Sequence, residues 1–255
     1  MASHRDTIVD QFTRQAVPFS TAPPIRDERA LQLLVEATAA GPDDTVLDVA
    51  CGPGLVVCAF ARVTRQVTGI DLTPAMIERA QTLVAEQGVS NVRLQVGDVL
   101  PLPFPDGAFS IVVSRFAFHH FRDPAAVLAE MRRVCRVGGR VAVADLTASD
   151  DPVKAANFHR MEMLRDPSHA RALTRAELHA LFDAAALPTP VQASWRMDIE
   201  LDGVLARSFP VPGSERVIRQ MFEDSLADDG LGLETRREGG RLCFTYFNVI
   251  LTAVR

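Results

Sequence analysis

The sequence predicts an α/β protein with a doubly wound, Rossmann-like sheet, and two patterns support that prediction. Short apolar segments that suit buried strands alternate with amphipathic segments that suit helices over residues 27–147. The apolar segment 45–50 runs directly into glycines that suit a tight turn into a helix. Composition agrees, because 47% hydrophobic and 23% charged residues in a chain of 255 are ordinary for a globular protein.

The core elements follow one another in regular order. Apolar residues at helical spacing predict helices over 27–40, 55–62, 74–86 and 124–135, and Pro74 suits a first helical turn. Short apolar runs predict parallel strands over 45–50, 66–70, 92–96, 109–113 and 140–146. We therefore expect a single domain over 1–255, with 27–147 as its core and 1–26 as an irregular or partly helical N-terminal arm.

The second half of the chain has a looser rhythm. Residues 153–165 and 203–229 suit helices, and a capping-box pattern from Thr174 to Glu177 predicts the start of another helix. A strand near 191–199 and a strand over 242–254, rich in aromatic and β-branched residues, complete the prediction. The expected sheet is seven-stranded, with an antiparallel C-terminal edge strand and a helical lid insertion at about 150–172 and 203–229.

Charge and cysteine content narrow the classes of function. The net charge is −5 without a basic tail, which argues against a nucleic-acid partner. No apolar run approaches about 18 residues and the first residues lack an apolar signal, so we expect a cytoplasmic protein without integral membrane contact. Four cysteines without paired spacing predict buried thiols and no metal site. Monomer and homodimer both remain open.

A glycine-containing motif follows the strand at 45–50. The motif runs from Val46 to Gly54, with the sequence Val-Leu-Asp-Val-Ala-Cys-Gly-Pro-Gly. A dinucleotide fingerprint requires a third glycine, and Val57 occupies that position. A phosphate-binding loop requires a Gly-Lys-Ser/Thr sequence, which does not follow here.

The motif resembles the first motif of class I S-adenosylmethionine (SAM)-dependent methyltransferases, D/E-x-G-x-G-x-G, with Ala50 in place of the first glycine. Further segments resemble later motifs of that family in the same order: Asp71 after the second strand, Gly97-Asp98-Val99 after the third, residues 102–114 around the fourth, and 132–139 before the fifth. The resemblance covers about 27–147. It is closest to the small-molecule branch around UbiE/menaquinone and sterol-type enzymes (methyltransferase type 11-like).

This resemblance implies a fold that binds SAM at the carboxyl ends of the strands. Asp71 would bind the ribose hydroxyls, Asp98 the exocyclic amine of adenine, and the Val99 backbone a ring nitrogen. The full set of cofactor-binding residues expected from the resemblance is Asp48, Ala50, Gly52, Gly54, Asp71, Leu72, Met76, Asp98, Val99 and Ser114.

Catalysis of methyl transfer requires alignment of donor and acceptor and exclusion of water, with a general base only where the nucleophile arrives protonated. His119 and His120 follow the fourth strand and are the candidate catalytic residues; the alternative is that they bond backbone and shape the pocket. Candidate acceptor contacts, beside the lid segments, are Arg115, Glu162, Arg165 and His169. Surface ion pairs and helix-end turns are the alternative for these four.

The leading interpretation is SAM-dependent methyl transfer to a small molecule by in-line displacement, giving S-adenosylhomocysteine (SAH). The segment Ser114–Ala117 lacks the N/D-P-P-Y/F motif of nucleic-acid amino-methyltransferases. A non-catalytic or repurposed SAM/SAH-binding protein remains an alternative. An NAD(P)-dependent oxidoreductase is disfavoured, because Tyr246 and Lys154 are the only tyrosine and lysine and form no recognisable catalytic pair. The sequence leaves the acceptor and the methylated atom open.

Overall fold

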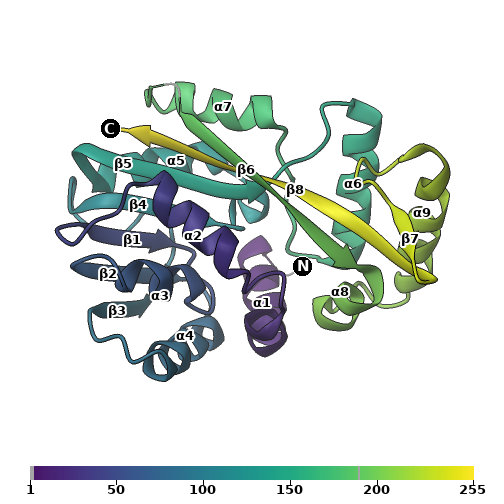
Figure 1. Ribbon diagram of the computed structural model, residues 1–255, viewed down its shortest axis with the longest axis horizontal. Helices are drawn as coiled ribbons and strands as arrows, with labels where there is room; N and C mark the ends of the chain where they lie inside the picture. Colours follow the sequence, from purple (N-terminus) through teal and green to yellow (C-terminus); the bar gives the residue numbers. More distant parts are fainter. Residues whose placement is uncertain (1–2, 189) are drawn as a thin grey trace.

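The computed structural model describes residues 3–188 and 190–255 and contains one mixed sheet (Figure 1). Its strand order is β3-β2-β1-β4-β5-β8-β6, and a short β7 pairs with β8 beside this path. The strands are β1 (Thr45–Val49), β2 (Gln66–Asp71), β3 (Val92–Val96), β4 (Phe109–Arg115), β5 (Cys135–Leu146), β6 (Val191–Glu200), β7 (Arg236–Glu238) and β8 (Arg241–Val254).

The first five strands are mutually parallel, and β8 runs antiparallel to both β5 and β6. This arrangement confirms the predicted α/β Rossmann-like class and the antiparallel C-terminal strand. The expected seven strands omit β7, a three-residue strand that forms a hairpin with β8 through Gly239 and Gly240. Both glycines have positive φ, which suits a tight hairpin turn.

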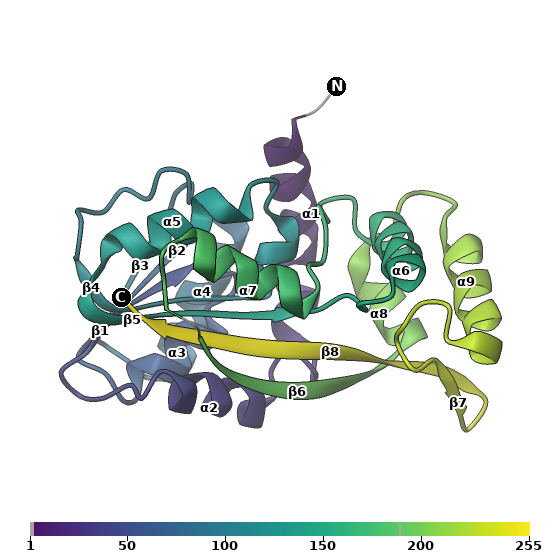
Figure 2. The ribbon, with the colours of Figure 1, turned by 90° about the horizontal axis from the view of Figure 1, so that it is seen from above.

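Helices cover both faces of the sheet because successive strand residues point to opposite sides. Val46 and Val67 pack with residues of α2 (Glu28–Ala37), α3 (Leu55–Ala61) and α4 (Pro74–Glu86) in one core cluster. Leu47 and Val112 pack with residues of α5 (Pro124–Val134) and α7 (Arg175–Ala184) in a second cluster. Figure 2 shows α2 and α3 on one side of the sheet and α5 and α7 on the other.

The N-terminal arm is more regular than predicted. Helix α1 (His4–Thr21) is continuous, and Ser3 and Asp6 form a capping box at its start. Pro23 and Pro24 follow the helix end. The three prolines obscured the helix in the sequence, because proline usually breaks helices, whereas Pro18 is accommodated in the last turn. Helix α1 packs against α4 and α8, so tertiary contacts support it.

The predicted lid segments are helical. They contain α6 (Pro152–Arg165), α8 (Leu201–Ser208) and α9 (Glu215–Asp228). Strands β6 and β8 extend beyond the rest of the sheet and carry these helices at one end of the molecule (Figures 1 and 2). Phe158, Phe222 and Phe244 lie in the same buried cluster and join α6, α9 and β8. Thr174 and Glu177 form the predicted capping box of α7.

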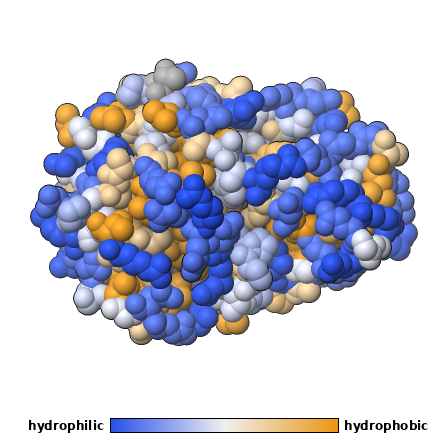
Figure 3. Space-filling view, viewed as in Figure 1, coloured by the Kyte–Doolittle hydropathy of each residue, from blue (hydrophilic) through white to orange (hydrophobic). Residues whose placement is uncertain are grey.

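The face shown in Figure 3 is largely hydrophilic, with apolar side chains scattered between charged ones. All four cysteines are free and buried. Within residues 3–188 and 190–255, no helix has the length and apolarity needed to cross a membrane, and no cluster of three or more His, Cys, Asp or Glu side chains has the geometry to bind a metal.

Candidate active site

A cavity of about 1050 Å³, including its open mouth, lies at the carboxyl ends of β1, β2 and β4. Ligand sites of open α/β sheets occur at this edge, and the volume suits a small ligand. Seven of the ten residues predicted to bind the cofactor line it: Ala50, Gly52, Asp71, Leu72, Met76, Asp98 and Val99. Helix α1 contributes His4, Arg5, Ile8, Phe12 and Phe19 to the same cavity.

The turn after β1 has the backbone that the glycine motif predicts. Ala50, Gly52 and Gly54 have φ values of 57°, 50° and 86°. A Cβ atom on Gly54 would lie 2.9 Å from the Cβ of Ala80, so α3 and α4 approach too closely there for any side chain. Ala50 occupies the left-handed region where the family motif has a glycine. The substitution therefore retains the turn at some conformational cost.

Asp71 joins this turn to β2. Its two carboxylate oxygens accept hydrogen bonds of 2.8 Å from the backbone N–H groups of Gly52 and Thr73. Burial raises the pKa of Asp71 above the ordinary range. A carboxylate has about four lone-pair sites, so two remain to accept hydroxyl groups of a ligand. These free acceptor positions fit the ribose hydroxyls of SAM.

Asp98 and Ser114 are both predicted cofactor contacts, but only Asp98 lines the cavity. Asp98 lines the cavity, accepts a hydrogen bond from the Leu100 N–H at 3.1 Å, and lies 3.4 Å from the Arg5 guanidinium of α1. Ser114 is fully buried and donates a 2.8 Å hydrogen bond to the Val49 carbonyl, outside the cavity lining. The position of Ser114 contradicts the predicted ligand contact: its hydroxyl ties β4 to β1.

Asp48 and Gly54 belong to the same motif but do not line the cavity. Asp48 is 1% exposed and its Oδ2 has no hydrogen-bond partner among the described residues. Burial raises the pKa of Asp48 well above its ordinary value, the negative charge of Asp71 adds to this, and Arg115 acts in the opposite direction. Asp48 is therefore a buried carboxyl group whose Oδ2 is left unpaired by the described residues.

A second cavity of about 650 Å³ adjoins the first. Phe12, Phe19, Ile25, Phe116 and His120 line both, so α1 lies across the two spaces. Further apolar residues come from β5, β6 and α8: Leu146, Met197, Ile199 and Val204. Polar groups are added by Gln15, His119, Arg165, Asp166, Arg207, Ser208 and Tyr246.

His119 lines this second cavity and forms a close pair with Asp145 at the end of β5. Its Nδ1 lies 2.7 Å from Oδ1 of Asp145, and its backbone N–H donates to Oδ2 at 3.1 Å. Burial alone lowers the pKa of His119, but the charge and hydrogen bond of Asp145 outweigh it and raise the pKa above 6.5. Sequence reasoning missed Asp145, although an acidic residue ending a buried strand, as Asp71 does, was the available signal.

His120 has a different environment from its neighbour. Its Nδ1 lies 3.0 Å from the Ser168 carbonyl oxygen, a contact that requires a proton on Nδ1. Burial and the adjacent positive charge of His119 lower the pKa of His120 to about 4. His120 is therefore neutral at physiological pH and borders both cavities.

The predicted acceptor contacts fall into different places. Arg165 lines the second cavity, and its guanidinium pairs with Glu162 at 2.5 Å. Glu162 is fully buried behind it and accepts a 2.7 Å hydrogen bond from the Tyr246 hydroxyl. The prediction for Glu162 is contradicted because both carboxylate oxygens are used within the protein and none faces the cavity.

His169 and Arg115 also lie away from the second cavity. His169 lines a separate recess beside His159, and neither of its ring nitrogens has a partner within the described part of the chain. Arg115 lines the first cavity, at the end of β4. His169 therefore lies apart from the second cavity, and Arg115 lies beside the predicted cofactor-binding residues.

Comparisons with known proteins agree with this geometry. Residues 47–143 match a family described as a methyltransferase domain. YcgJ of Bacillus subtilis, named an uncharacterized methyltransferase, is 31% identical over 247 residues, which cover 93% of this chain and 98% of that protein. Its crystal structure superposes with a TM-score of 0.82 at 28% identity, covering 89% of this chain and 98% of the other.

Two further structures share the fold. A protein from Bacillus halodurans, also described as a methyltransferase, gives a TM-score of 0.82 at 25% identity, over 89% of this chain and 98% of the other. A geranyl diphosphate methyltransferase in complex with SAM gives a TM-score of 0.65 at 21% identity, covering 89% of this chain and 84% of the other. Together with the glycine turn and the Asp71 carboxylate, these similarities establish that the chain belongs to the class I SAM-dependent methyltransferases.

Proposed function

We propose that this methyltransferase methylates a small, largely apolar molecule whose nucleophilic atom carries a proton, such as a hydroxyl oxygen. In this proposal His119 is the general base and Asp145 the positioning residue. The observation behind it is the buried His119–Asp145 pair in the wall of an apolar cavity that adjoins the cofactor cavity. A nucleophile that is already unprotonated would not need such a pair.

The tautomer of His119 supports this role. Nδ1 donates its hydrogen to Asp145, so Nε2 of the neutral ring carries a lone pair. Nε2 has no hydrogen-bond partner among the described residues. It is also not fully buried. A base needs this combination of a fixed ring, a free acceptor nitrogen and access to the substrate.

The proposed chemistry divides between cofactor and protein. SAM supplies a methyl group on a sulfonium centre, and in-line displacement by the acceptor leaves SAH. As the acceptor oxygen forms its bond to carbon, Nε2 of His119 takes the hydroxyl proton, and the Asp145 carboxylate stabilises the resulting imidazolium. The apolar walls from Phe12, Phe19 and Phe116 exclude water that would compete with the acceptor.

We further propose that the chain works as a single domain with two functional sides. The turn from Ala50 to Gly54, with Asp71, Leu72, Met76, Asp98 and Val99, binds the cofactor. Helices α1, α6 and α8 enclose the acceptor, since Phe12, Arg165 and Val204 come from them and line the second cavity. Arg165 is the one predicted acceptor contact that retains this role.

The test measures SAH release with matched acceptors. Phenols and aliphatic alcohols would be compared with secondary amines of the same carbon skeleton, using wild type, His119→Asn and the control His179→Asn on the exposed side of α7. We expect hydroxyl acceptors to be preferred, with His119→Asn about 10²- to 10⁴-fold slower and unchanged SAH binding. Preference for amines, or full activity of His119→Asn, would contradict the proposed base. SAH binding without turnover of any acceptor would favour a binding protein instead.

A further inference from the structure

Arg115 carries a buried positive charge that the protein only partly satisfies. It is the last residue of β4, is 8% exposed, and lines the cofactor cavity. Nη1 donates a 3.1 Å hydrogen bond to the Ile25 carbonyl. Nε and Nη2 are buried without a partner among the described residues. Leaving two charged N–H groups unpaired inside a protein is costly, so a missing acceptor is expected there.

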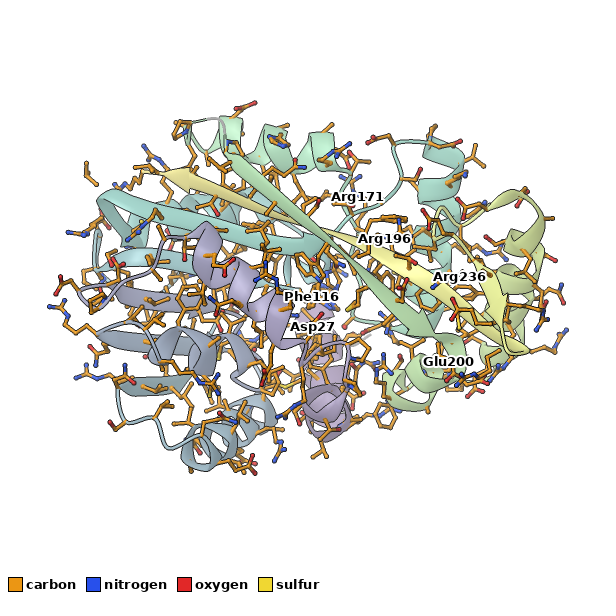
Figure 4. The ribbon with its side chains drawn as sticks, viewed as in Figure 1. Asp27, Phe116, Arg171, Arg196, Glu200 and Arg236 are labelled. Carbon is orange, nitrogen blue, oxygen red and sulfur yellow. The ribbon has the colours of Figure 1, made fainter. Side chains whose placement is uncertain are left out.

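The guanidinium is held in one orientation before any ligand arrives. Its carbon lies 4.4 Å from the ring centroid of Phe116, which stacks on it. The Ile25 carbonyl fixes one end of the group. Figure 4 labels Phe116 and Asp27 near the start of α2, and the charge of Asp27 acts on the same guanidinium. Burial lowers the pKa of Arg115 to about 10, so the group stays charged at neutral pH.

Asp48 is the acidic residue on the neighbouring strand, and it does not pair with Arg115. It lies on β1, the strand next to β4, and its Oδ2 is also buried and unpaired. Across the described residues, no ion pair within 4.0 Å joins Asp48 to Arg115. The two unpaired N–H groups of Arg115 are therefore available to a carboxylate of a ligand in the cavity that Arg115 lines. An α-amino acid has a carboxylate and an ammonium on one carbon.

We propose that Arg115 binds the α-carboxylate of the methionine part of SAM and SAH. The planar guanidinium presents its two unpaired N–H groups in the fork that suits a carboxylate. This assignment replaces the acceptor contact that the sequence suggested for Arg115. It rests on the SAM dependence of the family and not on the acceptor proposed above.

The test compares three ligands by isothermal titration. SAH carries both charges, its decarboxylated form 5′-(3-aminopropylthio)adenosine keeps only the ammonium, and 5′-methylthioadenosine lacks the amino acid. The variants are Arg115→Met, Arg115→Lys and the control Arg62→Met, whose guanidinium bonds Gln87 on the surface. The wild type should prefer SAH over the decarboxylated ligand by about 10- to 100-fold.

Arg115→Met should abolish this preference. The affinity for SAH should fall by about 10- to 100-fold, while the affinities for the other two ligands should change by less than about threefold. Arg115→Lys, which keeps the charge but loses the fork, should lie between wild type and Arg115→Met and provides the test if Arg115→Met does not fold. Equal weakening of all three ligands, or an unchanged preference, would overturn the assignment. Because only cofactor ligands are titrated, a wrong acceptor or base leaves these results unaffected.

Discussion

The two adjoining cavities differ in how the chain builds them. In the cofactor cavity, Gly52, Asp71 and Asp98 lie at or just after the carboxyl ends of β1, β2 and β3. The acceptor cavity is assembled from α1, the β4–α5 connection, α6, α8, β6 and β8. Backbone geometry therefore determines the first cavity, and the packing of distant side chains determines the second.

This difference separates binding from chemistry within one fold. The cofactor side includes the left-handed residues of the glycine turn, within the range that matches the methyltransferase domain. The second cavity includes His119, which pairs with Asp145, and Arg165, which pairs with the buried Glu162. Substitutions on one side should therefore change one measurement and spare the other.

The largest expected effect is on the cofactor side, at Asp71. Asp71→Ala removes the acceptor of the Gly52 and Thr73 N–H groups and the proposed ribose contact. We expect the SAH affinity to fall by about 100-fold or more, since each hydrogen bond to a charged group contributes about 1.5–3 kcal/mol. Isothermal titration with SAH checks this. Affinity within threefold of wild type would show that the ribose lies elsewhere.

A paired substitution in the glycine turn distinguishes steric from conformational requirements. Gly54→Ala places a methyl group 2.9 Å from the Ala80 Cβ at positive φ, and should lower the free energy of unfolding by about 2–4 kcal/mol. Ala50→Gly relaxes a left-handed residue while adding unfolded-state entropy, so its change should stay within about 1 kcal/mol. Urea unfolding of both variants measures the difference, and equal values would refute the close approach of α3 and α4.

On the acceptor side, Asp145→Asn should alter the pH profile. A base must be unprotonated, so kcat/KM of the wild type should fall as the pH drops through the pKa of His119, which lies above 6.5. Without the Asp145 charge, burial dominates and lowers that pKa, moving the acidic limb below its wild-type position. The plateau should also drop by about 10- to 100-fold. An unmoved limb would remove Asp145 from the proposed mechanism.

The contrast between the cavities also explains what the sequence predicted. Asp71, Asp98 and the glycine turn were found because each follows a strand within a few residues, and parallel strands end at one edge. Asp145 was missed because its partner His119 lies 26 positions away, at the end of a different strand. Pairing between segments depends on packing, which a single sequence does not encode locally.

The misplaced acceptor contacts have the same cause. Glu162, Arg165 and His169 lie on or just after α6, and helical spacing alone could not determine which of them faces the cavity. The orientation of α6 depends on α9 and on Tyr246 of β8, residues far along the chain. Arg115 lines the cofactor cavity and bonds the Ile25 carbonyl, a contact between segments 90 residues apart that no local pattern predicts.

The smallest expected effect concerns acid stability on the acceptor side. Burial lowers the pKa values of His169 and His120, the latter to about 4, so the unfolded chain binds protons that the folded chain does not. Their contributions to the free energy of unfolding are fully present above about pH 6.5 and are lost as the pH falls toward 4. His119 has a raised pKa, so its contribution has the opposite sign and is lost as the pH rises through that value. Among these three histidines, two have a lowered pKa and one has a raised pKa, so together they predict a net loss of stability on acidification.

His169→Phe tests this balance because the ring has no hydrogen bonds to lose: both nitrogens are buried without partners among the described residues. The variant should be as stable as wild type or more so at pH 7.5, since it removes an unsatisfied polar group. Between pH 6.5 and 5, its loss of unfolding free energy should be smaller by up to about 1.4 kcal/mol per pH unit. Urea unfolding at several pH values measures the slope, with exposed His179→Asn as the control. A slope equal to wild type would show that folding does not lower the pKa of His169, and would contradict its burial as an unpartnered ring.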